Sequence, residues 1–279
     1  MTLTVAASTK ADTNSAGSGR PVDIARKRAG AVTEQAVLAA LGTVSDPELD
    51  ESLVELGFLD SVRIEDEGCV EVVLRLPTFW CAPNFAYLMA FDAREQALGV
   101  PGVRQVRVVL KDHMYSDEIS TGISAGQPFD EVFPGQADGE DVGELRTLFH
   151  GKAFGMRQEQ LVRFLLDAGL TADEVVGLRL DDVLDTSNAS GLRLQVGGQP
   201  RLLRGGAPLA RTYLERRRRL RLDEDGRARL ITDPDGQPIA PSYLSEYLHT
   251  GRRQRISMTF NAVMCKGMLE TRYDLHGGR

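Results

Sequence analysis

The chain has few of the residues that mark specialised classes of protein. Its 279 residues include three cysteines and one tryptophan, and no apolar run approaches the roughly 20 residues that span a membrane. Three dispersed cysteines without a C-x-x-C pair exclude a disulfide framework. The N-terminal segment has no basic stretch followed by an apolar core, which argues against a secretory signal. These absences predict a soluble protein of a reducing cytoplasm, where free thiols persist.

Charge divides the chain into two unlike halves. Residues 1–140 carry 11 basic and 22 acidic side chains, and residues 141–279 carry 22 basic and 18 acidic ones, so that net charges of −11 and +4 give −7. Length and charge together favour two domains. The sequence predicts a disordered tail over residues 1–28, a first domain over residues 29–125, a linker over residues 126–143 and a second domain over residues 144–279.

The hydrophobic pattern of the first domain predicts a small α-β-β-α-β sandwich, which is an α+β fold. A helix with Thr33 as its cap is expected near residues 32–42. Alternating apolar residues predict a β-hairpin with strands near residues 58–64 and 70–76, and Pro77 ends the second strand. A helix over residues 83–98 and a strand over residues 103–110 complete the domain. The Gly-, Asp- and Ser-rich stretch that follows predicts a long loop.

The second domain is predicted to be mostly helical with one β-hairpin. An amphipathic helix is expected over residues 157–170, and a second helix begins with a capping box of Thr171 and Glu174. The glycines of "LRLQVGGQPRLLR" favour a tight hairpin turn. Two further helices are expected over residues 207–222 and 240–253.

Cys81 lies in "LPTFWCAPN", between a predicted strand and a predicted helix. A lone cysteine is usually a small buried hydrophobic residue. The free N–H groups and the dipole of a helix N-terminus, however, favour a thiolate, and Thr78 could donate a hydrogen bond there. Pro83 suits the first helical turn. Cys69 falls on the alternate strand face and is expected to be structural or a surface thiol.

Three motifs give residues 37–110 a resemblance to the iron–sulfur cluster assembly domains of the SufT and PaaD type. They are "SDPELDESLVELGFLDSVRI", the Thr-x-x-Cys of "PTFWCAPN", and "GVPGVRQVRVVL". The resemblance implies that Cys81 is the functional thiolate, that Asp46 and Glu48 line the site, and that Thr78 supports the loop. The implied cofactor is a transient iron–sulfur cluster or iron. A single thiolate cannot hold a cluster, so a second copy, a partner protein or His113 would supply the other ligands.

Some of these residues also have a structural explanation. Trp80 and Ala82 stand where the family has glycine and proline, and Trp80 would either cover the thiol or form a docking surface. An Asp-Pro pair starts turns, and a carboxylate at a helix start is stabilising without any function. His113 has acidic neighbours, but no recognised metal-ligand spacing surrounds it.

A run of arginines marks the second domain. It predicts either a partner or nucleic-acid patch or simply the solvated face of an amphipathic helix, and its members are Arg211, Arg216, Arg217, Arg218, Arg219 and Arg221. The same domain weakly resembles the catalytic domain of tyrosine recombinases. Thr171 replaces the first catalytic arginine of that family, the His249–Arg252 motif is misplaced, and Tyr273 is a poor nucleophile. The resemblance therefore implies a non-catalytic adaptor.

These observations predict a non-enzymatic maturation factor. It would deliver a metal centre to a client metalloenzyme, for which an oxygenase system is one candidate, and would work with cluster-assembly proteins, as a monomer or a homodimer. Two alternatives remain open at this point: a DNA-binding regulator with a cluster-sensing domain, and a protein-interaction scaffold in which Cys81 is inert.

Overall fold

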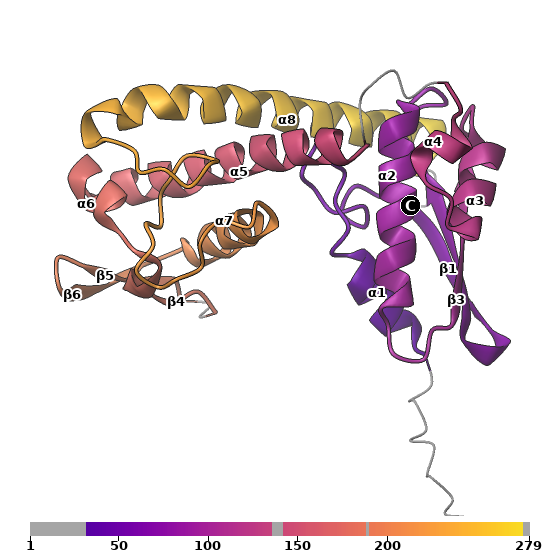
Figure 1. The fold of residues 1–279 in the computed structure, drawn as a ribbon, viewed down its shortest axis with the longest axis horizontal. Helices are drawn as coiled ribbons and strands as arrows, with labels where there is room; N and C mark the ends of the chain where they lie inside the picture. Colours follow the sequence, from indigo (N-terminus) through magenta and orange to yellow (C-terminus); the bar gives the residue numbers. More distant parts are fainter. Residues whose placement is uncertain (1–31, 136–141, 188–189, 276–279) are drawn as a thin grey trace, which may run out of the picture.

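The computed structural model describes residues 32–135, 142–187 and 190–275 (Figure 1). The predicted tail over residues 1–28 lies outside the described residues. Two three-stranded sheets and a set of helices make up the described chain. The predicted α+β class is therefore confirmed.

Residues 34–111 have the order of elements predicted for the first domain, and the names first and second domain are kept below for residues 32–135 and 142–275. Thr33 caps its first helix, because its hydroxyl accepts a hydrogen bond from the backbone N–H of Ala36 at 3.2 Å. Pro83 occupies the first turn of the second helix, where a missing N–H costs nothing. The elements are α1 (Glu34–Leu41), β1 (Leu59–Glu65), β2 (Cys69–Arg75), α2 (Pro83–Leu98) and β3 (Gln105–Lys111), with a short 3-10 turn at Asp66–Gly68.

Strand β2 is the centre of the first sheet. It pairs antiparallel with β1 and parallel with β3, and α2 makes the crossover that a parallel pair requires. Alternate residues of β3, Val106, Val108 and Leu110, point into the core. Ala86, Ala90, Ala93 and Ala97 of α2 belong to the same core. The loop between β2 and α2, which carries Cys81, thus springs from two well-packed elements.

The prediction of a long loop after β3 is wrong. The chain instead forms α3 (Ser116–Ala125) and α4 (Phe129–Val132). Ile119 and Ile123 of α3 are fully buried in the first core. Gly126, with φ of 74°, ends α3 in the left-handed conformation that glycine adopts freely.

The second domain contains the predicted hairpin and capping box. Thr171 and Glu174 bond reciprocally at the start of α6, and β5 pairs antiparallel with β6 around Gly197 and Gly198. Its elements are α5 (Val142–Asp167), α6 (Ala172–Gly177), β4 (Val183–Asp185), β5 (Leu192–Val196), β6 (Gln199–Leu203), α7 (Ala207–Arg219) and α8 (Leu244–Arg272), with 3-10 turns at Leu180–Asp182 and Pro241–Tyr243.

Helix α8 is much longer than the helix predicted over residues 240–253. Its 29 residues extend about 43 Å at 1.5 Å per residue. It runs beside α5 and reaches the first domain (Figure 1), where Ala262 and Leu269 enter the first hydrophobic core. The last helix of the chain therefore completes the packing of the first domain.

Ion pairs from α5 and α7 to two aspartates of the first domain join the two domains. The buried carboxylate of Asp50 receives Arg157 of α5 at 2.7 Å and Arg216 of α7 at 2.6 Å. Arg146 of α5 lies 2.8 Å from Asp92 of α2. Because buried charges require partners, these contacts fix the second domain against the first.

Candidate functional site

The loop that carries Cys81 is held in place by hydrogen bonds on both sides. The Thr78 hydroxyl and the Cys81 thiol lie 3.1 Å apart, and the backbone N–H of Met114 donates to the carbonyl of Phe79 at 2.9 Å. Cys81 is half-buried, and one residue, Ala82, separates it from the start of α2 at Pro83. Its sulfur is therefore in a defined place at the edge of the first core, as the sequence suggested.

His113 fixes this loop and has no ring nitrogen left for a metal. Its Nδ1 accepts a hydrogen bond from the N–H of Tyr115 at 3.2 Å, so Nε2 carries the proton and donates to the carbonyl of Cys81 at 2.8 Å. Burial is the main cause that lowers the pKa of His113, which favours this neutral form. The imidazole positions the backbone of Cys81, a role that sequence reasoning did not assign to it.

Asp46 is buried, whereas its neighbour Glu48 is exposed. One carboxylate oxygen of Asp46 accepts hydrogen bonds from the N–H groups of Glu48 at 2.8 Å and Leu49 at 2.9 Å. Burial outweighs these bonds and raises the pKa of Asp46 to about 6. Asp46 thus has the structural turn role considered above, and its protonation changes near neutral pH.

Cys265 of α8 is a second thiol within electrostatic range of Cys81. Cys81 and Cys265 both pack against the first hydrophobic core. Burial raises the pKa of Cys265 to about 11, and the charges of Asp46, Cys81 and Glu48 act in the same direction. Helix α8 is pinned there because Lys266 pairs with Glu51 at 2.7 Å and Arg272 donates to the carbonyl of Leu76 at 3.2 Å.

Sequence reasoning missed Cys265 because no local spacing links it to Cys81. The signal that could have found it is the shortage of cysteines itself: the chain has three, and of the two outside β2, Cys81 lies close enough to Cys265 for its charge to help raise the pKa of Cys265. Cys69 lies at the start of β2, opposite Gln105 of β3, and its sulfur is 4.0 Å from the Gln105 amide oxygen.

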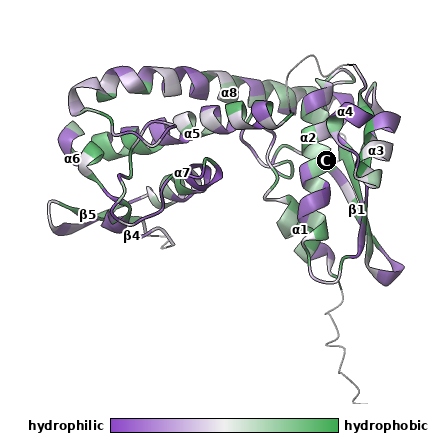
Figure 2. Cartoon of the chain, viewed as in Figure 1, coloured by the Kyte–Doolittle hydropathy of each residue, from purple (hydrophilic) through white to green (hydrophobic). Residues whose placement is uncertain are grey.

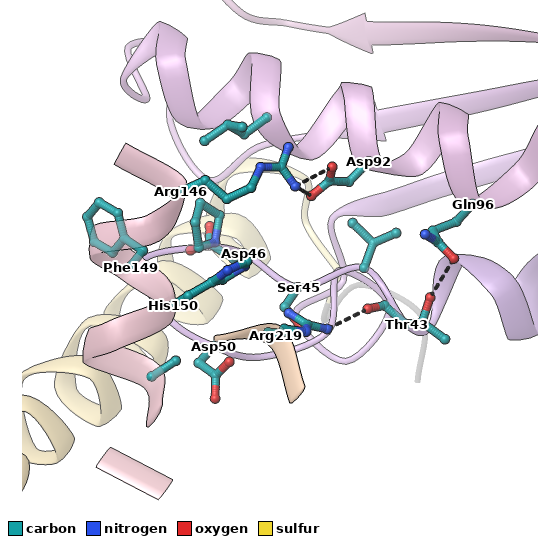
Figure 3. Close-up of a pocket in the computed structure, with 14 residues that line it drawn as sticks. Thr43, Ser45, Asp46, Asp50, Asp92, Gln96, Arg146, Phe149, His150 and Arg219 are labelled. Atoms are coloured by element: carbon teal, nitrogen blue, oxygen red, sulfur yellow. Dashed lines mark hydrogen bonds and ion pairs between the residues drawn. The ribbon is translucent and has the colours of Figure 1, made fainter. Parts of the chain in front are cut away.

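A polar cavity of about 230 Å³ is lined by residues of both halves of the chain (Figure 3). Asp46 and Asp50 from the first half and His150 and Arg219 from the second are among its lining residues. Burial is the main cause that lowers the pKa of His150 to about 4, and nearby arginines contribute. The imidazole in this cavity is therefore neutral near pH 7.

The arginine run does not form one continuous exposed patch. Arg216 and Arg217 are buried: Arg216 pairs with Asp50, and Arg217 donates to the hydroxyl of Thr232 at 3.2 Å and to the carbonyl of Asp223 at 2.8 Å. Figure 2 shows the hydrophilic end of α7 where these residues lie. The exposed members are Arg211, Arg218, Arg219 and Arg221, and only they remain candidates for binding a partner or nucleic acid.

Trp80 stands clear of the thiol. It is 73% exposed, and with Phe79 it forms one wall of an apolar groove of about 680 Å³ whose other wall is α8. Of the two roles considered for Trp80, the exposed ring fits a docking surface. Tyr273, just after α8, makes cation–π contacts with Arg75 and Lys111 of the first sheet, whose charged groups lie 5.2 Å and 5.3 Å from the centre of its ring.

Within the described part of the chain, no group of three histidine, cysteine or acidic residues is arranged to hold a metal ion. Cys81 and Cys265 thus belong to no such group. In the same residues no helix is long and apolar enough to cross a bilayer.

Comparison with known proteins identifies the first domain. Residues 34–108 match the family model described as "Iron-sulfur cluster assembly protein". A protein of Methanocaldococcus jannaschii, itself described as uncharacterized, is 36% identical over 89 residues, which are 32% of this chain and 92% of that protein. No solved structure was found to match. Through the domain that contains Asp46 and Cys81, the chain belongs to the family of iron–sulfur cluster assembly proteins.

Proposed function

We propose that the chain holds iron or an iron–sulfur cluster transiently and delivers it to a client metalloenzyme, without catalysing a reaction of its own. The observation that carries this proposal is the position of Cys81. Cys81 is a half-buried thiol on a hydrogen-bonded loop within the family-matched segment, and Cys265 of α8 lies within electrostatic range of it. Thiolates are the preferred ligands of iron–sulfur clusters.

A site that offers only the two thiols of Cys81 and Cys265 suits cargo that must leave again. Each thiol releases one proton when its sulfur bonds to iron and takes one back when the cargo departs, and no electron is transferred. Because the pKa of Cys265 is about 11, this residue is a neutral thiol near pH 7 until iron displaces its proton. Two thiols leave ligand positions for a donor or a recipient protein. Transfer can then proceed by exchange of ligands one at a time.

A client metalloenzyme and cluster-assembly proteins are the partners that this role requires, and an oxygenase system remains the client class suggested by the resemblance to PaaD-type proteins. The proposal places the chain in a reducing compartment such as the cytoplasm. There Cys69, Cys81 and Cys265, all of them free thiols, would stay available.

Anaerobic reconstitution with ferrous iron and sulfide tests the proposal. Iron content and the visible absorption of sulfur-to-iron charge transfer should be lost in Cys81→Ser and reduced in Cys265→Ser. Cys69→Ser is the matched control, because Cys69 lies at the start of β2, and it should reconstitute like the wild type. Unchanged iron content and spectrum in Cys81→Ser would refute the proposal. Loss in Cys81→Ser with no effect of Cys265→Ser would keep Cys81 and remove Cys265 from the site.

A further inference from the structure

The outer face of α8 is apolar and free of charge over four turns. The exposed residues between positions 256 and 271 are all uncharged: Ile256, Ser257, Thr259, Phe260, Val263, Met264, Gly267, Met268 and Thr271. The opposite face, with Met258, Ala262 and Leu269, is buried. A helix with apolar residues on two opposite faces has two packing partners, and the described chain supplies only the inner one.

This exposed face is large. Trp80, Phe79 and Phe260 are 73%, 51% and 64% exposed. At roughly 150–250 Å² per aromatic side chain, these three rings alone leave on the order of 400 Å² in water, and Ile256, Val263, Met264 and Met268 add to it. Monomeric proteins rarely expose a continuous apolar patch of more than a few hundred Å². The face is therefore expected to be an interface.

The pattern of the face is complementary to itself. Its outermost positions within α8, 253, 256, 260, 263/264, 267 and 271, follow the three- and four-residue steps of a helix-pairing seam. Suppose that two copies of α8 pair antiparallel, with the two-fold axis between Val263 and Met264. Each residue then faces the residue of the other copy for which the two residue numbers sum to 527. Phe260 then faces Gly267 of the copy, and Ile256 faces Thr271.

The large and the small residues fit each other. A Cβ added at Gly267 would meet no atom within 4 Å, so the space above this glycine is open. Gly267 also lines the groove of about 680 Å³ between α8 and the loop of Phe79 and Trp80. The ring of Phe260, 64% exposed, has the size and chemistry to fill that groove in a second copy.

Charge at the ends of the seam agrees with the same pairing. Arg253 of α8 and Asp274, two residues beyond the end of α8, are both exposed and lie at opposite ends of the seam. Each would lie near its opposite charge in the copy, at the polar rim that surrounds an apolar interface core. A pairing in which every interaction occurs twice is the isologous arrangement of a two-fold dimer.

We infer that a second copy of this chain docks on α8, with Phe260 of each copy seated over Gly267 of the other beside Trp80. In this dimer, each candidate cysteine site lies beside its own α8, so both sites are next to the same pair of helices. It does not depend on whether those sites carry iron, because it follows from the outer face of α8 alone.

Sedimentation velocity of the full chain over a range of concentrations tests the inference. The wild type should sediment as a dimer. Gly267→Leu should be monomeric, because its side chain fills the groove, and it should not unfold, because the space around Gly267 is open and leucine favours helix. Phe260→Asp should also be monomeric. Leu202→Asp is the control: Leu202 is 52% exposed on β6, away from α8, so this variant should remain a dimer.

The charged ends supply a second test. Arg253→Glu should weaken dimerisation, and Arg253→Glu combined with Asp274→Arg should restore it. A wild type that is monomeric at every concentration would overturn the inference and leave the patch to a different protein. A Gly267→Leu variant that stays dimeric would overturn it as well, because the groove would then play no part in the association.

Discussion

Replacing Asp50 by Asn should strongly destabilise the protein although it preserves the shape of the side chain. Asp50 is 4% exposed and receives both Arg157 and Arg216, whose pairs with it measure 2.7 Å and 2.6 Å. Asparagine keeps the volume of the side chain. It also tolerates the left-handed backbone of residue 50, where φ is 53°. The variant therefore isolates the loss of one buried negative charge.

The expected cost follows from what is left behind. Removing one partner of a buried ion pair leaves an uncompensated charge and typically costs about 3–5 kcal/mol. The guanidinium of Arg216 is 7% exposed and cannot turn to water without opening the contact between the domains. Arg157 keeps one partner, since its Nη2 donates to the backbone carbonyl of residue 50 at 2.7 Å. Arg216 would keep only a longer contact of 3.8 Å with the exposed carboxylate of Glu215, so most of the expected cost comes from Arg216.

Urea unfolding at neutral pH, followed by circular dichroism, measures the effect. The control is Glu224→Gln, because Glu224 and Arg218 form an exposed pair at 3.4 Å, and such pairs contribute about 0–1 kcal/mol. A loss of less than about 1 kcal/mol in Asp50→Asn would show that the two arginines find water or other partners. The Asp50 contact would then not hold the domains together.

Two further changes test the site and its support. Burial raises the pKa of Asp46 from 3.8 to about 6, so the native state binds this proton more tightly than the unfolded state. The free energy of unfolding therefore falls by up to about 3 kcal/mol as the pH rises from about 3.8 to about 6. Asp46→Asn should therefore exceed the wild type in urea midpoint at pH 7 and match it at pH 3.5; equal midpoints at both would contradict the assignment. In Gly251→Ala the new Cβ would lie 2.6 Å from the backbone oxygen of Gly155, so overpacking between α5 and α8 should cost about 1–3 kcal/mol. Gly151→Ala, where a Cβ would meet no atom within 4 Å, should instead gain about 1 kcal/mol, and the same sign for both variants would show that α5 and α8 do not approach closely at Gly251.

The sequence predicted those elements whose signals are local. The alternation of β2, the proline at the first turn of α2, the capping box at Thr171 and the glycine pair of the second hairpin each depend on neighbours a few residues away. Helix α3 was missed because serine and glycine dominate its sequence and suggest a loop. It exists because Ile119 and Ile123 are buried in the first core, a gain that no local propensity expresses.

The candidate site was predictable only in its N-terminal part. Asp46 and Cys81 were found through short motifs, but Cys265 enters through a contact between distant parts of the chain. The burial of Arg216 has the same origin, because its partner Asp50 belongs to the other domain. The end of α8 was predicted 19 residues too early, since the expected helix stopped at residue 253 and the observed one ends at Arg272. Its apolar residues face two directions, so they do not produce the single stripe by which a helix is recognised.

Helix α8 explains why an assembly domain of this size carries a second domain at all. A thiol on an isolated helix end would have no fixed place beside Cys81. Arg255 of α8 pairs with the buried Glu159 of α5 at 2.7 Å, and Arg157 of the same helix holds Asp50 of the first domain. Helix α5 thus contacts both the helix that carries Cys265 and the segment that carries Asp46. In the proposed function, the second domain acts as a brace that holds α8, and with it Cys265, against the first domain, and this role does not depend on its surface arginines.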